Sequence, residues 1–314
     1  MRTITASQLR LGACAETDLK RLQKQATFYV NITIADAAIR LCFDDEQVAN
    51  VFSSRYREHR TSAAKSFDYY IARDTARYLF WSEASPLWTW DHCLLTPDAV
   101  AFLTDAVFMS ALIRKTKSFT SLHGAAISSD GVVAAVIGDS TAGKTTTAIA
   151  CARRGMRFLS DERVLLHKRT VMPFLRSMNI RSGGLRLLST DQVDDLCGSS
   201  AGLRSHSDSD WENVSIADLF GSEAISPPGP LQAVFVLSEF RETPIAQEIT
   251  PLQTMPALMR WLDCQDSGLA RIERVLDILK GVKCYRLYPG KPDATAREIA
   301  RIAAARQRQV ELSP

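Results

Sequence analysis

Residues 138–145 have the types and the spacing that bind phosphate. They read GDSTAGKT, a glycine followed five residues later by a second glycine, which a lysine and a threonine follow at once. Glycines permit backbone conformations that turn successive N–H groups toward an anion. The lysine can reach the β- and γ-phosphates of a nucleotide, and the hydroxyl beside it can bind Mg²⁺. The residues predicted to contact a nucleotide are Gly138, Asp139, Ser140, Thr141, Ala142, Gly143, Lys144, Thr145 and Thr146.

The segments on either side of this glycine loop supply the context that a phosphate site requires. Residues 131–137 read GVVAAVI, which is typical of a buried strand, and residues 145–155 read TTTAIACARRG, which predicts a helix. A helix that begins there directs the positive end of its dipole at the same anion. The alternative is a chance match in a glycine turn between two core elements. Because strand, loop, lysine, hydroxyl and helix are all in register, the sequence predicts a nucleotide phosphate site.

Two acidic residues follow the loop after one predicted helix and one predicted strand. The sequence RFLSDERV, residues 157–164, is an apolar strand that ends in Asp161 and Glu162. Phosphoryl transfer needs a carboxylate that accepts or orients the hydroxyl proton, so we expect Asp161 to be catalytic rather than a simple cap of the turn. Glu162 is either a supporting acid or a solvated residue at the strand end. With the hydroxyl of Thr145, the two acids form the predicted metal site.

A histidine and an arginine complete the predicted catalytic set, which also contains Asp161 and Lys144. His123 precedes a glycine within the predicted strand 121–128. A lone histidine on an apolar strand is usually a hydrogen-bonded core residue, but the adjacent glycine favours a place near the phosphates. Arg181 is expected to neutralise charge on the transferred phosphate, with a surface ion pair as the alternative.

Composition narrows the class of protein. The 314-residue chain has a formal net charge of +3, from 38 basic and 35 acidic residues. This balance does not favour binding to nucleic acid or to a membrane surface. Seven cysteines without a CxxC pair favour reduced thiols in a cytoplasmic protein. The N-terminal sequence has no apolar signal region, and the most apolar helical stretch, residues 99–113, is too short for a bilayer.

The first part of the chain, residues 1–115, is predicted to be a β-rich region closed by a helix. Residues 27–43 alternate apolar and polar side chains as a strand pair does, and three aromatic-rich strands are expected at 67–72, 77–82 and 86–95. The sequence Thr96-Pro97-Asp98 supplies a capping hydroxyl, a proline at the first helical position and an acid in the first turn. It therefore predicts a helix that runs to about Arg114.

The second part, residues 116–314, is predicted to be an α/β nucleotide-binding domain. Short apolar strands recur between glycine turns, and a helix is expected at 250–262. A terminal helix is expected at 293–309. Residues 196–210 are small, polar and rich in turn formers, so they predict a mobile loop. The strands are expected at 121–128, 132–138, 157–161, 163–168, 231–240 and 284–289.

The combined pattern over about residues 118–190 resembles HPr kinase/phosphorylase and its relatives, which share a nucleotide-binding core with the ATP-dependent phosphoenolpyruvate carboxykinases. The motifs that carry the resemblance are LHGAAI, GDSTAGKTT, ARRGMRFLSDERV and NIRSGGLRLL. It implies an α/β fold with a P-loop core of this type, and ATP and Mg²⁺ as cofactors. It also implies that His123 lies beside the phosphates, that Asp161 is the general base on a seryl hydroxyl and that Thr145 holds the metal.

Two positions differ from the pattern of HPr kinases. Glu162 stands where those enzymes have aspartate, and Asn179 stands where a metal-binding glutamate opens the later signature. The chain is therefore more similar to HPr-kinase-related proteins that phosphorylate other acceptors, one group of which modifies the C-terminal serine of lasso-peptide precursors. The resemblance implies a kinase for a serine or threonine hydroxyl on a peptide or protein, such as the precursor of a ribosomal peptide product.

Three alternatives stay open. A nucleotide-binding regulatory module would sense ATP without transferring phosphate, and Asn179 favours it, whereas Asp161 and His123 favour the kinase. A small-molecule kinase and carboxykinase chemistry on a small dicarboxylate are the other two. A homo-oligomer also stays open, since HPr kinases are hexameric and related kinases need not be.

Overall fold

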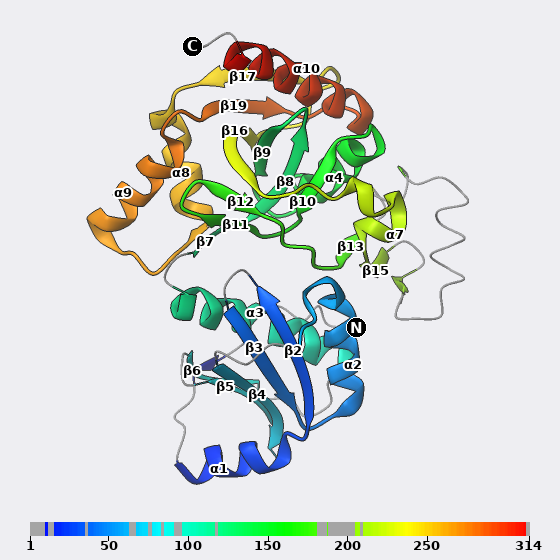
Figure 1. The fold of residues 1–314 in the computed structure, drawn as a ribbon, viewed down its shortest axis with the longest axis vertical. Helices are drawn as coiled ribbons and strands as arrows, with labels where there is room; N and C mark the ends of the chain where they lie inside the picture. Colours follow the sequence, from blue (N-terminus) through cyan, green and yellow to red (C-terminus); the bar gives the residue numbers. More distant parts are fainter. Residues whose placement is uncertain are drawn as a thin grey trace. The chain divides into compact units, whose positions relative to one another are not determined.

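The computed structural model describes residues 10–11, 16–34, 37–62, 67–74, 77–82, 85–90, 96–116, 119–180, 187, 205–207 and 210–311. The chain forms two compact units, Met1–Lys117 and Ser118–Pro314. Each unit contains one large sheet with both parallel and antiparallel neighbours, so the fold is mixed α/β (Figure 1).

The first unit is built on a six-stranded sheet with the order β1-β6-β5-β4-β3-β2. Strands β3 and β4 are parallel, and the other neighbours are antiparallel. The elements are β1 (Arg10–Leu11), α1 (Glu16–Gln25), β2 (Phe28–Ile34), β3 (Ala37–Phe43), α2 (Glu46–Arg55), β4 (Phe67–Asp74), β5 (Arg77–Ser82), β6 (Ser85–Trp90) and α3 (Pro97–Thr116).

Local signals decided much of this unit. The predicted strand pair at 27–43 is confirmed as the antiparallel pair β2–β3, and the helix predicted from Pro97 is confirmed as α3. The hydroxyl of Thr96 accepts a hydrogen bond from the N–H of Ala99 at 3.3 Å, as a capping residue does. The description as a β-rich region closed by one helix was incomplete, because α1 and α2 were not predicted. The carboxylate of Asp45 caps α2 by accepting hydrogen bonds from two N–H groups of its first turn.

The apolar helix α3 is a core helix. Its Asp105 is buried and accepts a hydrogen bond from the hydroxyl of Tyr56, which explains how an acid is tolerated there. Phe108, from the same helix, packs edge-on against Phe52 and Tyr56. Among the helices that the structure describes, none combines the length and the apolar character needed to cross a bilayer.

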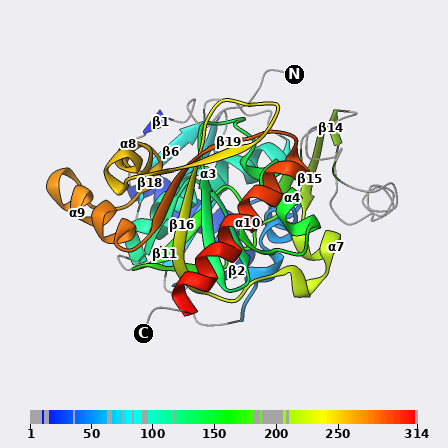
Figure 2. The ribbon, with the colours of Figure 1, turned by 90° about the horizontal axis from the view of Figure 1, so that it is seen from above.

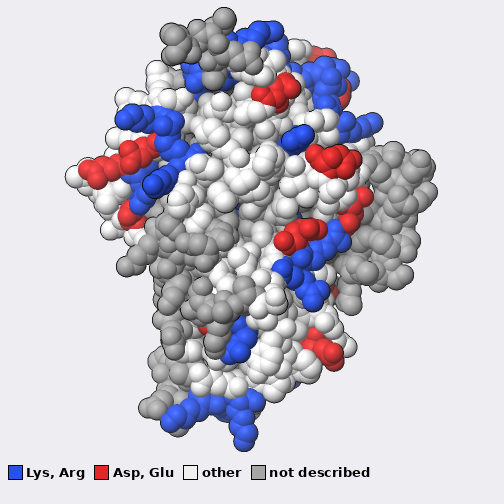
Figure 3. Space-filling model, viewed as in Figure 1, with Lys and Arg blue, Asp and Glu red and all other residues white. Residues whose placement is uncertain are grey.

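The second unit contains, in chain order, β7 (Phe119–Leu122), β8 (Gly124–Ser129), β9 (Val132–Ile137), α4 (Lys144–Arg153), β10 (Arg157–Ser160), β11 (Val164–His167), β12 (Thr170–Met172), β13 (Met178–Ile180), β14 (Ser205–Ser207), β15 (Asp210–Val214), α7 (Ile216–Phe220), β16 (Gly229–Leu237), β17 (Ile245–Ile249), α8 (Pro251–Trp261), β18 (Leu262–Asp263), α9 (Gly268–Leu279), β19 (Lys283–Tyr288) and α10 (Pro292–Glu311). Acidic and basic side chains are interspersed on the face seen in Figure 3.

The centre of its large sheet consists of the parallel strands β9, β16 and β19. Strands β8 and β10 extend the sheet beyond β9, β17 extends it beyond β19, and the series β12-β11-β7-β18 joins it at β16. Because β9, β16 and β19 are parallel, their carboxyl ends meet at one edge, here called the carboxyl edge. The opposite edge is called the amino edge. In open α/β sheets, ligands bind outside the carboxyl edge.

Both faces of the central strands are covered. Ala134 and Val136 of β9 belong to the core that includes residues of α4 and α10, whereas Ala135 and Ile137 belong to the core that includes residues of α8 and α9. Figure 2 shows the two helix pairs on different sides of the strands. A strand buried on both faces requires a continuous apolar sequence, which is why β9 reads VVAAVI.

The predicted loop at 196–210 lies mostly outside the described residues. Its last part differs from the prediction, since residues 205–207 form β14 and residue 210 begins β15. These strands pair with each other and, through β15, with β13. Strand pairing supplies hydrogen-bond partners that a composition of small polar residues does not reveal.

Candidate functional site

The glycine loop, residues 138–145, joins the carboxyl end of β9 to the first turn of α4. Gly143 is the N-cap of α4 and has φ of 96°, a value that L side chains rarely adopt. Gly138 is required for a different reason, because a Cβ there would lie 2.9 Å from the Cβ of Leu237 in the neighbouring strand β16. No side chain caps α4, so the N–H groups of its first turn are not engaged by an N-cap side chain.

Lys144 lies inside the curve of the loop. Its side chain is buried, and Nζ donates hydrogen bonds to the carbonyl oxygens of Gly138 at 3.0 Å and Asp139 at 2.8 Å. Burial lowers the pKa of this ammonium group from its usual value, while nearby Asp161 acts in the opposite direction. The remaining loop residues differ in exposure: Ser140 and Thr141 are exposed, Ala142 packs on the core, and Thr145 and Thr146 are half-buried in the first turn of α4.

Asp161 is the acid that the structure brings to the loop. Strand β10 pairs with β8, which is the neighbour of β9, and it ends at Ser160. The hydroxyl of Thr145 then donates a hydrogen bond of 2.8 Å to Oδ2 of Asp161. The second oxygen, Oδ1, is buried without a hydrogen-bond partner among the described residues. Burial raises the pKa of this carboxyl, and the hydrogen bond from Thr145 limits the rise.

These groups fit a magnesium ion that also binds phosphate. Within the described part of the chain, no group of three or more His, Cys, Asp or Glu side chains could hold a metal alone. Mg²⁺ is usually bound by one or two carboxylates together with substrate phosphates and water, rather than by an all-protein cage. The unpartnered oxygen of Asp161 and the hydroxyl of Thr145 are oxygen donors of the type that such an ion takes.

Glu162 has a different environment from Asp161. It adopts the left-handed region with φ of 66°, its carboxylate forms an ion pair with Arg176, and its carbonyl accepts a hydrogen bond from the N–H of Gly124 at 3.2 Å. The backbone of Glu162 therefore ties the acidic turn to the start of β8. Its carboxylate is directed to Arg176, whereas the carboxylate of Asp161 is directed to the glycine loop.

His123 lies at a break between two strands. The single strand predicted at 121–128 was wrong, because β7 pairs with β11 and β18 whereas β8 pairs with β9 and β10. The glycine after His123 is explained by packing, since a Cβ on Gly124 would lie 2.6 Å from the carbonyl oxygen of Val136. Burial and the positive charges of Lys144 and Arg163 lower the pKa of His123 to about 4. Its ring is therefore neutral at pH 7.

Two residues that were not predicted complete the described cluster. Trp261, at the end of α8, has its ring centroid 5.3 Å from that of His123, and Nζ of Lys144 lies 5.9 Å from the indole centroid. The guanidinium of Arg260 stacks 4.7 Å from the same indole and forms an ion pair of 3.1 Å with Asp139 of the loop. The sequence signal was only an Arg-Trp pair at the end of a predicted amphipathic helix.

Some predicted residues fall outside this description. Arg181 lies outside the described residues, and so does the side chain of Asn179. The structure therefore brings together His123, Lys144, Thr145 and Asp161, and the roles assigned to them stay predictions.

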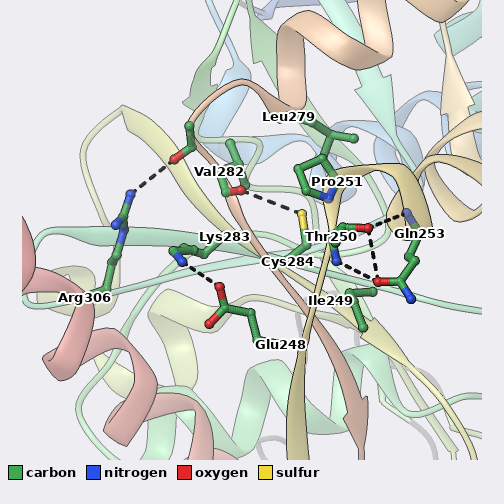
Figure 4. A pocket seen from close by; sticks show the side chains of 11 residues that line it. Glu248, Ile249, Thr250, Pro251, Gln253, Leu279, Val282, Lys283, Cys284 and Arg306 are labelled. Atoms are coloured by element: carbon green, nitrogen blue, oxygen red, sulfur yellow. Dashed lines mark hydrogen bonds and ion pairs between the residues drawn. The ribbon is translucent and has the colours of Figure 1, made fainter.

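Two pockets of the second unit lie at the amino edge, away from the loop. One has a volume of about 510 Å³ and lies where the end of β17 meets the starts of α8 and β19 (Figure 4). The other, of about 760 Å³, is lined by residues at the starts of β9 and β16. Lining residues of the first pocket pair with one another, as Lys283 does with Glu248.

Comparison with known proteins gives a distant structural likeness and no match in sequence. No family model matches the sequence, and no curated protein matches it. Among the solved structures similar to this chain is the Hpr(Ser) kinase/phosphatase from Coxiella burnetii, with a TM-score of 0.31 and 12% identity. The match covers 61% of this chain and 92% of that one. The function proposed below is supported by this chain's own residues.

Proposed function

We propose that this protein is an ATP- and Mg²⁺-dependent kinase with an HPr-kinase-like P-loop core, and that it phosphorylates a serine or threonine hydroxyl on a peptide or protein. One observation carries the proposal: the hydrogen bond from Thr145 to Asp161 places a buried carboxylate at the first turn of the helix that follows the glycine loop. A carboxylate beside a phosphate-binding loop is what transfer to a hydroxyl requires.

Each residue has a defined task in this reaction. The N–H groups of the loop and Lys144 bind the phosphates, and the ammonium charge stabilises the γ-phosphoryl as it moves. Thr145 and Asp161 would hold Mg²⁺, which would neutralise charge on the phosphates. As the acceptor oxygen bonds to the γ-phosphorus, the bond to the bridging oxygen breaks, ADP leaves with that electron pair, and Asp161 takes the hydroxyl proton.

The environment of Asp161 suits this task. Without a bound metal ion, burial raises the pKa of this carboxyl, and general bases are most effective when their pKa lies near the working pH. His123 is neutral at pH 7, so it adds no positive charge to the site and is available as a hydrogen-bond donor or acceptor.

The test is incubation with ATP, Mg²⁺ and a panel of acceptors, with phosphate addition read by mass. The panel contains seryl and threonyl peptides, a lasso-peptide precursor, an HPr-type protein and small alcohols. We expect transfer to a peptide or protein hydroxyl, lowered about 10²–10³-fold in Lys144→Ala, the effect of removing one preorganised electrostatic group. The unfolding midpoint of each variant shows whether the fold is retained.

The same experiment tests the rival function. Tight ATP binding without transfer to any acceptor would favour a regulatory nucleotide-binding module, the reading that Asn179 supports. Transfer at an unchanged rate in Lys144→Ala would instead show that the glycine loop does not hold the transferred phosphate.

A further inference from the structure

Three elements converge on the ammonium group of Lys144. Trp261 reaches it from the end of α8, His123 lies beside Trp261 at the break between β7 and β8, and Asp139 contributes its carbonyl from the loop. Arg260 extends over the indole of Trp261 to the carboxylate of Asp139. A guanidinium group is therefore held directly over a loop with the residue types of a phosphate site.

The backbone that carries Arg260 and Trp261 is anchored on both sides. The carbonyl of Trp261 accepts a hydrogen bond from the N–H of His123 at 2.9 Å, and the next residue, Leu262, pairs with Leu122 of β7. Arg271 donates hydrogen bonds to the carbonyl oxygens of Met259 at 2.8 Å and Leu262 at 2.7 Å. Movement of Arg260 therefore requires a change of its side chain only.

The ion pair that holds Arg260 is weak and easily exchanged. The side chains of Arg260 and Asp139 are each 64% exposed, and ion pairs as exposed as this one contribute little to stability because water screens them. A phosphate group has more negative charge than a carboxylate and accepts two parallel hydrogen bonds from one guanidinium. The indole of Trp261 keeps the guanidinium in place through a cation–π contact while its partner changes.

We propose that Arg260 recognises the terminal phosphate of a nucleoside triphosphate, moving from Asp139 to that phosphate, and that Trp261 is the positioning residue that supports it. This inference rests on the proposed function and adds a cation to the one that Lys144 supplies. It makes the site selective for triphosphate over diphosphate, because the diphosphate has no group at the position that Arg260 reads. The indole of Trp261 also lies 5.9 Å from Nζ of Lys144, so Trp261 contacts both cations of the proposed phosphate site.

The test compares dissociation constants for MgATP and MgADP by titration calorimetry in a double-mutant cycle. Arg260→Gln should weaken the binding of MgATP about 10-fold, which is the effect of losing a hydrogen bond to a charged group. It should weaken the binding of MgADP less than about twofold. Asp139→Asn should strengthen MgATP, because Arg260 loses its competing partner. The double variant should behave as Arg260→Gln does. Arg274→Gln is the matched control, since it breaks a surface ion pair of α9 with Asp266.

Variants of Trp261 test whether this residue positions the guanidinium of Arg260 or only fills space in the fold. Trp261→Leu should reduce the preference for MgATP over MgADP, and Trp261→Phe should restore most of it because a phenyl ring also supports a guanidinium. A failure of Phe to restore the preference would overturn the role of Trp261.

Other outcomes overturn the inference as a whole. Equal weakening of MgATP by Asp139→Asn and Arg260→Gln would show that the ion pair only maintains the shape of the loop. If Asp139→Asn still strengthens the binding of MgATP when Arg260 is already replaced by Gln, the gain would come only from removing the repulsion between the carboxylate of Asp139 and the phosphates. Equal loss of MgATP and MgADP in Arg260→Gln would leave the kinase proposal intact and reject terminal-phosphate recognition. Failure of the wild-type chain to bind either nucleotide would reject the proposed function itself.

Discussion

The two edges of the large sheet in the second unit differ in how deeply their charged side chains are buried. At the amino edge lie pockets of about 510 and 760 Å³, and charged residues that line them form exposed ion pairs, Lys283 with Glu248 and Arg154 with Asp293. At the carboxyl edge, Lys144 and Asp161 are buried and have pKa values displaced by that burial. The carboxyl edge therefore holds two charged groups under burial that costs free energy, whereas these two ion pairs of the amino edge are exposed to water.

The starts of two helices show the same contrast. At the amino edge, α8 begins with a capping box in which Thr250 and Gln253 satisfy each other's N–H groups. At the carboxyl edge, α4 begins at Gly143, where no side chain caps the helix. The first helix start is closed by its own side chains, whereas the second keeps N–H groups that an anion can use. Buried charged groups and uncapped N–H groups, rather than the volume of a pocket, indicate the reactive edge.

The largest effect is expected from Asp161→Asn. The amide keeps the shape of the side chain but cannot take a proton, so phosphate transfer should fall by about 10²–10⁴, the usual contribution of a positioned base. Nucleotide binding measured without Mg²⁺ should change little. Glu162→Gln is the matched control, because that carboxylate is paired with Arg176, and it should retain most of the activity. Wild-type transfer in Asp161→Asn would place the base elsewhere.

The pH dependence tests the environment of Asp161. The active form is the carboxylate, so transfer should fall as the pH drops through its pKa, which burial places above the usual value of an aspartate. The hydrogen bond from Thr145 lowers that pKa, so Thr145→Val should move the acid limb to higher pH.

His123 provides the control for this profile. Its pKa of about 4 lies below the working range, so His123→Gln should leave the midpoint of the acid limb unchanged. The measurement is kcat/KM against pH for the three proteins. An acid limb that moves in His123→Gln and stays in Thr145→Val would assign the titration to the histidine.

A pair of variants at the two helix starts sharpens the contrast between the edges. Gly143→Ala introduces a side chain at φ of 96°, which costs about 1–2 kcal/mol of stability. It should also weaken the binding of ATP, because the loop changes shape. Thr250→Ala removes a cap worth about 1 kcal/mol and should leave the affinity for ATP unchanged. Urea unfolding and nucleotide titration give both quantities. Weaker ATP binding in Thr250→Ala would show that the two edges are coupled.

The smallest effect is expected at the amino-edge pocket. Lys283→Gln breaks the ion pair with Glu248, whose partners are 40% and 56% exposed, so the free energy of unfolding should change by less than about 1 kcal/mol. Phosphate transfer should stay within about twofold of the wild type, the range of surface changes remote from a site. A large loss of transfer would move the candidate site to the amino edge and reverse the comparison.

The sequence by itself determined the features that depend on neighbours along the chain. The spacing of Gly138, Gly143 and Lys144 placed a glycine loop between a strand and a helix, because backbone freedom and a helix start are local properties. Alternation over residues 27–43 and the cap at Thr96 located β2, β3 and the start of α3 for the same reason. Helices α1, α2, α7 and α9 were not predicted, although α1 and α9 are amphipathic and Asp45 and Ser215 cap α2 and α7, so their sequences did carry local signals.

Only the tertiary structure decided the contacts between residues that are distant in sequence. The break at His123 arises because β7 and β8 pair with different strands, and no local pattern records which partners a strand will have. Arg260 and Trp261 lie over the loop because β18 pairs with β7, a strand that is distant from it in the sequence. The pKa values of Asp161 and His123 likewise follow from burial, which is a property of the packed molecule and not of any segment.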